Sequence, residues 1–400
     1  MNAQEKIRLL YFHPTIVFGG AERTTVTLLE KLDKSIFDVL FITKKGIFHP
    51  LPVERVMYID DLGIHDGFEG IGSLVKDTKI MLQLINKERP DIVFGMLHYA
   101  CIILSLMKIR LRDRVRIIIS PRTPSKDAIN FYFKDNMKKR LVWNFMVRFF
   151  CRYSDRIVVA SEGIKEECIT EYKAERKKVV TINNSVDAQS VGRFSVESID
   201  EESSPDHFVI STAGRLSAEK NIAVLLNAFA LMRRDLKAKL WIVGDGPERP
   251  HLKSLAASLN IMDDIVFWGF QENLYKFIKK SDIFVHTSLF EGFGNIILEA
   301  MACGVPVIAT NCPFGPREII NNGENGILVP VSDEGALAKA LKMVLENKEA
   351  RKRFVENAYK RLSEFTPERM VRSYENVFLS IAHSNGPLRS KELREDSILL

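Results

Sequence analysis

The chain has 400 residues, of which 46% are apolar and 27% charged, and its formal net charge is +6. This length exceeds what one hydrophobic core usually supports, so we expect two domains; the composition excludes extensive disorder, and the modest charge permits anionic partners without calling for nucleic acid. The five cysteines show no C-x-x-C spacing, and the N-terminus does not resemble a signal sequence, so we expect reduced thiols in a cytoplasmic protein. No apolar run reaches the roughly 20 residues that are needed to cross a bilayer.

Short apolar runs alternate with amphipathic stretches through the first half of the chain, which is typical of a parallel α/β sheet. The predicted strands are Arg8–Phe12, Val39–Thr43, Asp91–Gly95, Ile117–Ser120, Arg156–Ala160 and Lys178–Ile182. The first strand leads to Gly19 and Gly20 before a predicted helix, where free backbone amides could face an anion. A tight turn that needs glycine for positive φ explains the pair equally well.

A basic amphipathic helix is predicted between Phe133 and Tyr153. Its apolar rows are Leu141-Phe145-Phe149 and Val142-Met146-Phe150, and beside them runs the polar row Arg140, Asn144, Arg148 and Arg152. Such a helix can lie on an anionic membrane surface. It can equally be a core helix with a solvated basic face, and the sequence leaves both interpretations open.

A polar, acidic stretch between Phe194 and His207 interrupts the alternation, and we interpret it as an interdomain linker. Beyond it the predicted strands are Phe208–Ala213, Ala238–Val243, Ile265–Trp268, Ile283–Thr287, Val305–Thr310 and Gly326–Val329, with a helix over Ala223–Leu236. We therefore expect two doubly wound domains facing a cleft, over residues 1–195 and 207–366. A helix over 367–383 returns to the first domain, and residues 384–400 form a flexible tail.

Two cations, Arg215 and Lys220, follow the first strand of the second domain. Ligands bind at the carboxyl ends of parallel strands, and a guanidinium with an ammonium could hold a diphosphate and neutralise it as it leaves. The alternative is a solvated surface loop. Gly244, in the Gly-Asp-Gly turn after the next strand, could let a nucleotide lie against the backbone, although such turns are also common for structural reasons.

The most informative run is Glu291-Gly-Phe-Gly-Asn-Ile-Ile-Leu-Glu299. It places Glu291 in a glycine loop and Glu299 on the following helix, with the amides of Gly292, Phe293, Gly294 and Asn295 between them. Carboxylates accept hydrogen bonds from sugar or ribose hydroxyls, and amides at a helix N-terminus bind phosphate. A glycosidase acid/base pair also uses two carboxylates, but hydrolysis needs neither the paired cations nor the glycine loop.

This run resembles the E-x7-E motif of glycosyltransferase family 4, whose members are retaining enzymes of the GT-B fold. The Gly-Arg-Leu…Glu-Lys-Asn run around Arg215 and the early Gly-Gly-Ala-Glu-Arg are also similar to that family, and together the similar segments cover nearly the whole chain. The run Asn311–Glu318 resembles a subset that includes bacterial transferases building lipid-linked glycans. The resemblance implies a GT-B fold with the nucleotide sugar between the two domains.

The resemblance also implies residue roles. Arg215 and Lys220 would hold the donor diphosphate, Glu291 the transferred sugar and Glu299 the ribose hydroxyls, while Gly20 would sit against the diphosphate across the cleft. His98, which follows the strand Asp91–Gly95, would face the substrate, although a lone histidine in this place is as often structural. Arg215, Lys220 and helix dipoles would replace a divalent metal, in keeping with the lack of an Asp-x-Asp motif.

We therefore expect a retaining, metal-independent transferase that moves a hexose or N-acetylhexosamine from a UDP-sugar to a lipid-linked or surface glycan. Its partners would be the nucleotide sugar, the acceptor and the inner face of the membrane. The leaving phosphate would help to take the acceptor proton, so Glu291 would position the sugar rather than attack it. Two alternatives remain: a sugar-nucleotide-binding protein without turnover, and a GT-B-like sugar-nucleotide epimerase.

Overall fold

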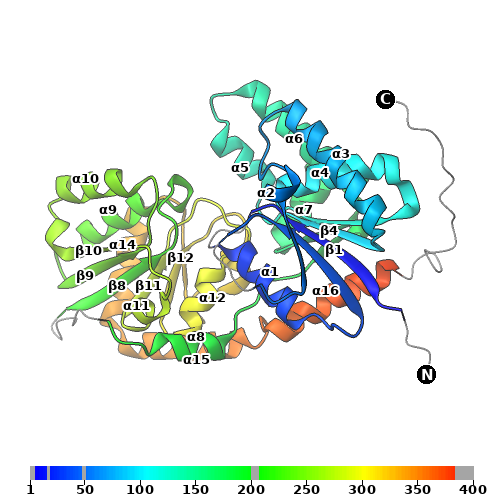
Figure 1. Cartoon of the computed structure of the whole chain (residues 1–400). Helices are drawn as coiled ribbons and strands as arrows, with labels where there is room; N and C mark the ends of the chain where they lie inside the picture. Colours follow the sequence, from blue (N-terminus) through cyan, green and yellow to red (C-terminus); the bar gives the residue numbers. More distant parts are fainter. Residues whose placement is uncertain (1–4, 16–18, 47–50, 200–206, 383–400) are drawn as a thin grey trace.

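The computed structural model describes residues 5–15, 19–46, 51–199 and 207–382. The chain forms two lobes, each built on a parallel sheet with helices on both faces (Figure 1). The N-terminal sheet has the strand order β3-β2-β1-β4-β5-β6-β7, and the C-terminal sheet has the order β10-β9-β8-β11-β12-β13. The two doubly wound sheets that the sequence predicts are thus present.

The strands agree closely with the predicted ones. In the N-terminal sheet they are β1 (Ile7–His13), β2 (Phe37–Thr43), β3 (Arg55–Tyr58), β4 (Ile92–Met96), β5 (Arg116–Ser120), β6 (Arg156–Val159) and β7 (Val179–Thr181). In the C-terminal sheet they are β8 (Phe208–Ala213), β9 (Ala238–Val243), β10 (Ile265–Gly269), β11 (Ile283–His286), β12 (Val307–Thr310) and β13 (Ile327–Val329). Only β3, a short edge strand with no fully buried residue, is absent from the prediction.

Helices connect successive strands and cover both faces of each sheet. Those before the C-terminal sheet are α1 (Gly20–Lys31), α2 (Ile59–Leu62), α3 (Ile71–Glu88), α4 (His98–Leu111), α5 (Ser125–Tyr132), α6 (Met137–Tyr153), α7 (Glu162–Thr170) and α8 (Ala188–Ser195). The later ones are α9 (Ile222–Met232), α10 (Arg249–Ser258), α11 (Tyr275–Lys279), α12 (Asn295–Ala302), α13 (Pro316–Ile319), α14 (Glu334–Glu346), α15 (Lys348–Leu362) and α16 (Pro367–Ala382).

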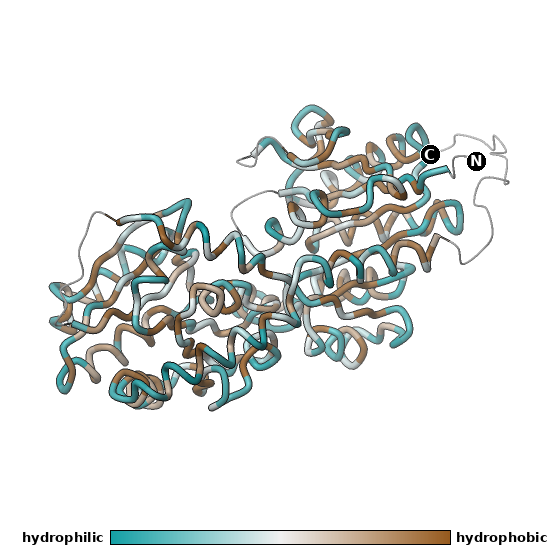
Figure 2. Tube along the Cα trace, turned by 90° about the horizontal axis from the view of Figure 1, so that it is seen from below, coloured by the Kyte–Doolittle hydropathy of each residue, from teal (hydrophilic) through white to brown (hydrophobic). Residues whose placement is uncertain are grey.

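Alternating side chains of β1 show how the core of the N-terminal lobe is built. Leu10 and Phe12 pack into the cluster under α3, α4 and α6, whereas Leu9 and Tyr11 face the opposite side of the sheet. Both faces are buried, which is why the strand is a continuous apolar run. Figure 2 shows these apolar segments in brown running through the lobes, with hydrophilic stretches on the outside.

The last helix, α16, returns from the C-terminal lobe and packs beneath the N-terminal sheet (Figure 1). Its Tyr374 and Phe378 lie against Phe94 of β4, with ring centroids 5.7 and 5.5 Å apart. The predicted boundary at residue 195 assigns α8 to the first domain, whereas Val191 of α8 packs with apolar side chains of α12 in the C-terminal lobe. Residues 200–206 of the predicted linker and the predicted tail lie outside the described residues.

The sheet topology places the predicted site residues at two facing edges. Strand order reverses between β1 and β4 in one sheet and between β8 and β11 in the other. Open parallel sheets bind ligands at the carboxyl ends of the strands where the order reverses. The loops after these four strands carry, in chain order, Gly19 with Gly20, His98, Arg215 with Lys220, and Glu291.

Candidate active site

One carboxylate oxygen, Oε1 of Glu291, gathers three polar side chains of the C-terminal lobe. Lys220 Nζ lies 2.5 Å from it, and Ser288 Oγ donates to it at 2.8 Å. His286 Nε2, at the end of β11, lies 3.0 Å from the same atom. Backbone contacts between the two loops hold the cluster, because Leu289 N donates to Glu219 O at 2.8 Å and Thr287 Oγ1 donates to Lys220 O at 2.8 Å.

The charges in this cluster depend on one another. Burial alone would raise the pKa of Glu291, but the Lys220 ammonium and the His286 ring outweigh it and hold that pKa far below its usual value. Burial would likewise lower the pKa of Lys220, and Glu291 reverses the direction and raises it. Both groups are therefore charged at neutral pH. The arrangement presents a fixed anion and a fixed cation at the carboxyl end of the sheet.

The glycine loop after Glu291 is packed against the opposite lobe. A Cβ on Gly292 would lie 2.0 Å from the carbonyl oxygen of Arg122, so this position has no room for a side chain. Gly294 has φ +99° and forms the N-cap of α12, a conformation that favours glycine. The side chain of Phe293 is buried beside Phe365, with ring centroids 5.6 Å apart, so only its backbone is placed to meet a ligand.

The glycine pair before α1 meets the N-terminus of α12. Gly19 has φ −161° and Gly20 begins the helix, so a need for positive φ does not explain either glycine. Close approach does: a Cβ on Gly20 would lie 3.1 Å from Asn295 Nδ2, and that amide donates to Gly20 O at 3.2 Å. Asn184, after β7, donates to Asn295 Oδ1 at 2.6 Å. Gly20 and Asn184 of one lobe thus both contact the Asn295 side chain at the start of α12 in the other lobe.

Arg122 holds Asn184, the residue that contacts Asn295. Its buried guanidinium donates to Asn184 Oδ1, to Thr24 Oγ1 at 3.3 Å and to the Tyr374 hydroxyl at 3.2 Å. A chain of hydrogen bonds therefore runs from α16 through Arg122, Asn184 and Asn295 to Gly20. This chain fixes the position of one lobe's glycine pair relative to the other lobe's helix.

Glu299 lies on α12, as predicted, but its carboxylate is already engaged by the other lobe. Arg23 Nη1, from the first turn after Gly19, forms an ion pair with Glu299 Oε1. The same Nη1 donates to the Tyr275 hydroxyl at 2.7 Å. Arg23 ends the Gly-Gly-Ala-Glu-Arg run that resembles the family, but the sequence predicts no role for Arg23 or for Tyr275.

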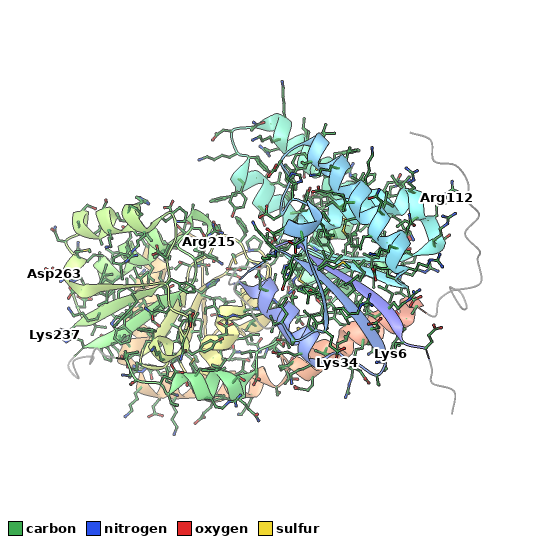
Figure 3. All side chains as sticks on the ribbon, in the orientation of Figure 1. Lys6, Lys34, Arg112, Arg215, Lys237 and Asp263 are labelled. Atoms are coloured by element: carbon green, nitrogen blue, oxygen red, sulfur yellow. The ribbon has the colours of Figure 1, made fainter. Side chains whose placement is uncertain are left out.

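Arg215 and Gly244 lie at the same edge of the C-terminal sheet. Figure 3 places Arg215 on the side of its lobe that faces the N-terminal lobe, and the side chain is exposed. Its charge acts on Tyr132 of the N-terminal lobe, where it opposes the rise that burial causes in the pKa of the Tyr132 hydroxyl. A Cβ on Gly244, which has φ +135°, would lie 1.9 Å from Gly214 O, so close backbone approach explains this glycine. Its predicted nucleotide contact stays a prediction.

His98 begins α4 at the carboxyl end of β4. Its Nε2 lies 2.9 Å from Ser125 Oγ, and its ring meets Phe150 edge-on at 6.0 Å. Burial lowers the pKa of His98 to about 4, so the ring is neutral at pH 7. These contacts lie within the N-terminal lobe and do not include the Glu291 cluster, so the predicted substrate contact of His98 stays a prediction.

The basic helix α6 exposes an apolar row. Met137, Leu141 and Phe145, one turn apart from each other, are 62, 64 and 68% exposed, while Val147 and Phe150 on the other face are buried. Exposed cations flank the row at Lys138, Lys139, Arg148 and Arg152. The predicted apolar rows are therefore only partly in the core, since Leu141 and Phe145 are exposed and Phe150 is buried, and the membrane contact of this helix stays a prediction.

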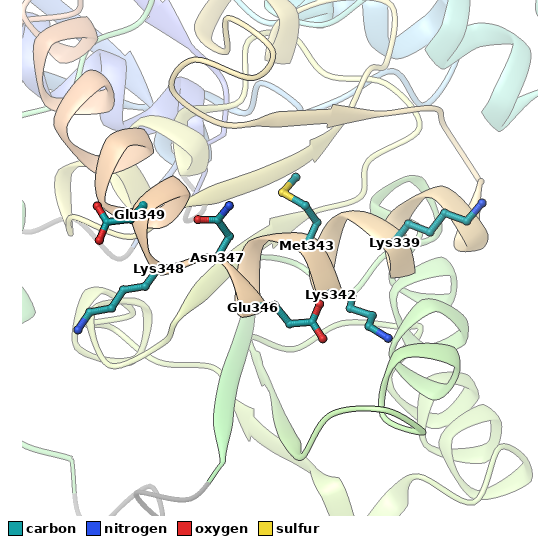
Figure 4. Close-up of a pocket in the computed structure, with 7 residues that line it drawn as sticks. All are labelled: Lys339, Lys342, Met343, Glu346, Asn347, Lys348 and Glu349. Carbon is teal, nitrogen blue, oxygen red and sulfur yellow. The ribbon is translucent and has the colours of Figure 1, made fainter.

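A shallow surface hollow of about 560 Å³ lies elsewhere, along α14 and the start of α15. Its seven lining side chains come from these two helices and the residue between them and point in different directions (Figure 4), and none is a predicted site residue. Among the residues that the structure describes, no group of three or more His, Cys, Asp or Glu side chains is placed to hold a metal ion. No helix in the described ranges is long and apolar enough to cross a membrane.

The sequence could have indicated some of the site residues that the prediction missed, but not the contacts that they make. His286 is the last residue of β11, so the rule that ligands bind at strand ends could have identified it. Arg23 lies in the first turn of α1, one helical turn after the N-cap Gly19, so its place next to the glycine pair could have identified it. Asn184 and Arg122 follow β7 and β5 at the same edge of the N-terminal sheet, so the strand-end rule applies to them as well, but it does not reveal their bond to each other or the bond of Asn184 to Asn295.

Two family models match the chain. The model described as Glycosyltransferase Family 4 matches residues 18–190, and the model described as Glycosyl transferases group 1 matches residues 196–361. The first match contains Gly19 and Gly20. The second contains Arg215, Lys220 and the run from Glu291 to Glu299.

Curated relatives are similar over different lengths. A Campylobacter jejuni subsp. jejuni protein named N-acetylgalactosamine-N,N'-diacetylbacillosaminyl-diphospho-undecaprenol 4-alpha-N-acetylgalactosaminyltransferase is 28% identical over 359 residues, 88% of this chain and 94% of that protein. The Bacillus anthracis N-acetyl-alpha-D-glucosaminyl L-malate synthase is 30% identical over 241 residues, 60% of this chain and 63% of that protein.

Solved structures share the architecture. Anabaena Alr3699/HepE in complex with UDP superposes with a TM-score of 0.73 at 19% identity, over 94% of this chain and 100% of that one. Sucrose-phosphate synthase from Thermosynechococcus elongatus gives a TM-score of 0.78 at 18% identity, over 94% of this chain and 99% of that one. These likenesses confirm the predicted GT-B fold.

Proposed function

Because this chain belongs to the glycosyltransferases, in the group 1 and family 4 lineage, we propose that it moves a hexose or N-acetylhexosamine from a UDP-sugar to a lipid-linked or surface glycan. The Lys220–Glu291 pair carries the proposal, since it sets a cation and a carboxylate beside the amides at the start of α12. The Campylobacter relative is named as an N-acetylgalactosaminyltransferase acting on a diphospho-undecaprenol, which supports this class of sugar and acceptor. HepE was crystallised with UDP, so a uridine nucleotide is the first donor to test.

In the proposed reaction, Arg215 and Lys220 stabilise the charge that develops on the leaving diphosphate, as preorganised cations do in other active sites. The contacts described for the Glu291 carboxylate all use Oε1, so Oε2 is the oxygen that we propose for a sugar hydroxyl. Gly20 and the amides of Gly294 and Asn295 would approach the diphosphate from opposite sides.

We propose that transfer retains the anomeric configuration and needs no metal. The bond from the anomeric carbon to the diphosphate oxygen breaks, and the acceptor oxygen forms the new bond on the same face of the sugar. The leaving phosphate oxygen takes the acceptor's proton. Closure of the lobes excludes water and so favours transfer over hydrolysis.

The exposed row Met137, Leu141 and Phe145, with its flanking cations, is proposed to rest on the anionic inner face of the membrane. Apolar side chains would enter the interface while lysine and arginine meet the lipid head groups. A lipid-linked acceptor would then reach the cleft without leaving the bilayer. The protein is accordingly proposed to act in the cytoplasm, peripherally bound to the membrane.

A screen of nucleotide sugars for thermal stabilisation, followed by measurement of nucleotide release with and without acceptor, tests this function. We expect a UDP-sugar to give the largest shift, and release to require an acceptor glycan. Activity should persist in excess chelator, and NMR of the product should show the donor's anomeric configuration. Release without any acceptor would instead indicate epimerase or hydrolase chemistry, and binding without turnover would indicate a binding protein.

A further inference from the structure

The contact between Arg23 and Glu299 joins the two lobes at the place proposed for the nucleotide. Arg23 lies on α1, three residues after Gly20, and Glu299 lies on α12; Figure 1 shows these two helices at the junction of the lobes. One guanidinium nitrogen, Nη1, serves both Glu299 Oε1 and the Tyr275 hydroxyl. The guanidinium carbon also lies 5.6 Å from the centre of the Tyr275 ring. A single side chain therefore fixes two groups of the opposite lobe.

Because the Glu299 carboxylate is buried, loss of this ion pair costs more free energy than loss of an ion pair on the surface. The Glu299 side chain is 6% exposed and that of Arg23 is 31% exposed. Exposed ion pairs contribute little, whereas a buried carboxylate that loses its cation is left uncompensated. The orientation of Glu299 thus depends on a residue from the other lobe.

The ion pair with Arg23 uses one oxygen of the Glu299 carboxylate and leaves the other, Oε2, able to accept hydrogen bonds. Within the described ranges, each side-chain contact of Glu299 uses Oε1, and none uses Oε2. A carboxylate oxygen accepts hydrogen bonds from the paired hydroxyls of a ribose. Arg23 therefore fixes the orientation of the carboxylate while Oε2 can still accept hydrogen bonds.

We propose that Arg23 is a positioning residue for nucleotide recognition, which holds Glu299 from the opposite lobe so that Oε2 receives the ribose hydroxyls. This inference rests on the proposed function and deepens it. It makes nucleoside binding depend on both lobes, because the carboxylate that reads the ribose is oriented by α1. The phosphate contacts of Lys220 and Arg215 do not pass through Arg23.

The test compares two probes, UDP and its 2′,3′-dideoxy analogue, by calorimetric titration of the full chain. For Arg23→Ala and Arg23→Gln we expect the Kd of UDP to rise about tenfold or more, the effect of one charge-assisted hydrogen bond. The dideoxy analogue, which lacks the hydroxyls, should bind wild type and variants alike. Glu299→Gln should behave as the Arg23 variants do, and combining it with Arg23→Ala should cost no more than either change alone.

Lys31→Ala is the matched control, since Lys31 ends the same helix and pairs with exposed Glu368 at 2.9 Å, away from the site. Its UDP affinity should equal that of wild type. An unchanged Kd for UDP in both Arg23 variants, or equal weakening of UDP and the dideoxy analogue, overturns the role of Arg23 while leaving the proposed function intact. If wild type binds none of UDP, ADP, GDP and CDP, the proposed function and this inference both fall.

Discussion

Lys220 Nζ and Glu291 Oε1 lie 2.5 Å apart, although 71 positions separate the two residues in the chain. They meet because β8 and β11 are neighbours in the C-terminal sheet and the loops after both strands leave the same edge. The ion pair fixes the cation for phosphate and the carboxylate for sugar in one geometry. A change at either residue therefore alters both halves of the proposed donor site.

Lys220→Ala should lower kcat by roughly 10²- to 10³-fold, because a preorganised cation is lost from the leaving group. It should also destabilise the fold by about 1 to 3 kcal/mol, since Glu291 is left as a buried, uncompensated charge. Steady-state kinetics and urea unfolding measure the two effects. Adding Glu291→Gln should restore most of the stability without restoring turnover.

Arg215→Ala provides the contrasting variant. Its kcat should also fall by roughly 10²- to 10³-fold, but its stability should stay within about 0.5 kcal/mol of wild type, because the side chain is exposed. Equal transfer rates for this variant and wild type would contradict its assignment to the diphosphate.

Gly292→Ala should impair the enzyme through sterics alone. The new Cβ would meet the backbone carbonyl of Arg122 at 2.0 Å, so the glycine loop and the loop after β5 would have to separate. We expect a loss of about 1 to 3 kcal/mol, as for overpacked sites, and at least a tenfold drop in kcat. Gly72→Ala on α3 is the control, because its Cβ would have no atom within contact distance and alanine has a higher helix propensity than glycine. A Gly292 variant as stable and active as the control would refute the close contact.

The double variant Leu141→Ser and Phe145→Ser should lose binding to anionic vesicles. Both side chains are more than half exposed on α6, and burying each in a bilayer interface is worth about 1.5 to 3 kcal/mol at most. Sedimentation with phosphatidylserine vesicles at low salt should therefore show at least tenfold weaker binding. Met343→Ser, an exposed apolar site on α14, should bind as wild type does. Failure of wild type to sediment would exclude the membrane role.

Acid should destabilise the fold partly through His98. Its folded pKa is lowered by burial to about 4, while the unfolded value is near 6.5, so between these values only the unfolded chain takes up the proton. Stability should therefore be fully present above pH 6.5 and fall as pH decreases toward 4. Urea titrations at pH 7 and pH 5 should show that His98→Gln loses about 1 to 2 kcal/mol less than wild type. Equal losses would mean that His98 titrates normally.

The strands were predictable because a parallel strand buried on both faces must be a short, continuous apolar run. β3 could not be predicted in this way, since its four residues at the sheet edge are partly exposed. The meeting of Lys220 and Glu291 follows from the rule for strand ends, once both flanking strands are recognised. The helix carrying Glu299 was predictable because it follows the glycine loop and precedes the next recognisable strand.

Contacts between the lobes were beyond the reach of sequence patterns. Periodicity reports which side chains face one sheet, whereas the pairing of Arg23 with Glu299 depends on how two separately built sheets dock. The same limit applies to the hydrogen bond from Asn184 to Asn295, which forms only where the glycine pair meets α12.

The return of α16 to the N-terminal sheet has a consequence for synthesis of the chain. One face of that sheet, with Leu9, Tyr11 and Phe94, is covered by Tyr374 and Phe378 near the end of the described chain. Helix α1 covers part of this face, but during synthesis the part beneath α16 stays exposed until the entire C-terminal sheet has been translated. Nascent chains truncated before residue 367 should therefore be strong clients of chaperones, even when every strand of the first sheet has emerged.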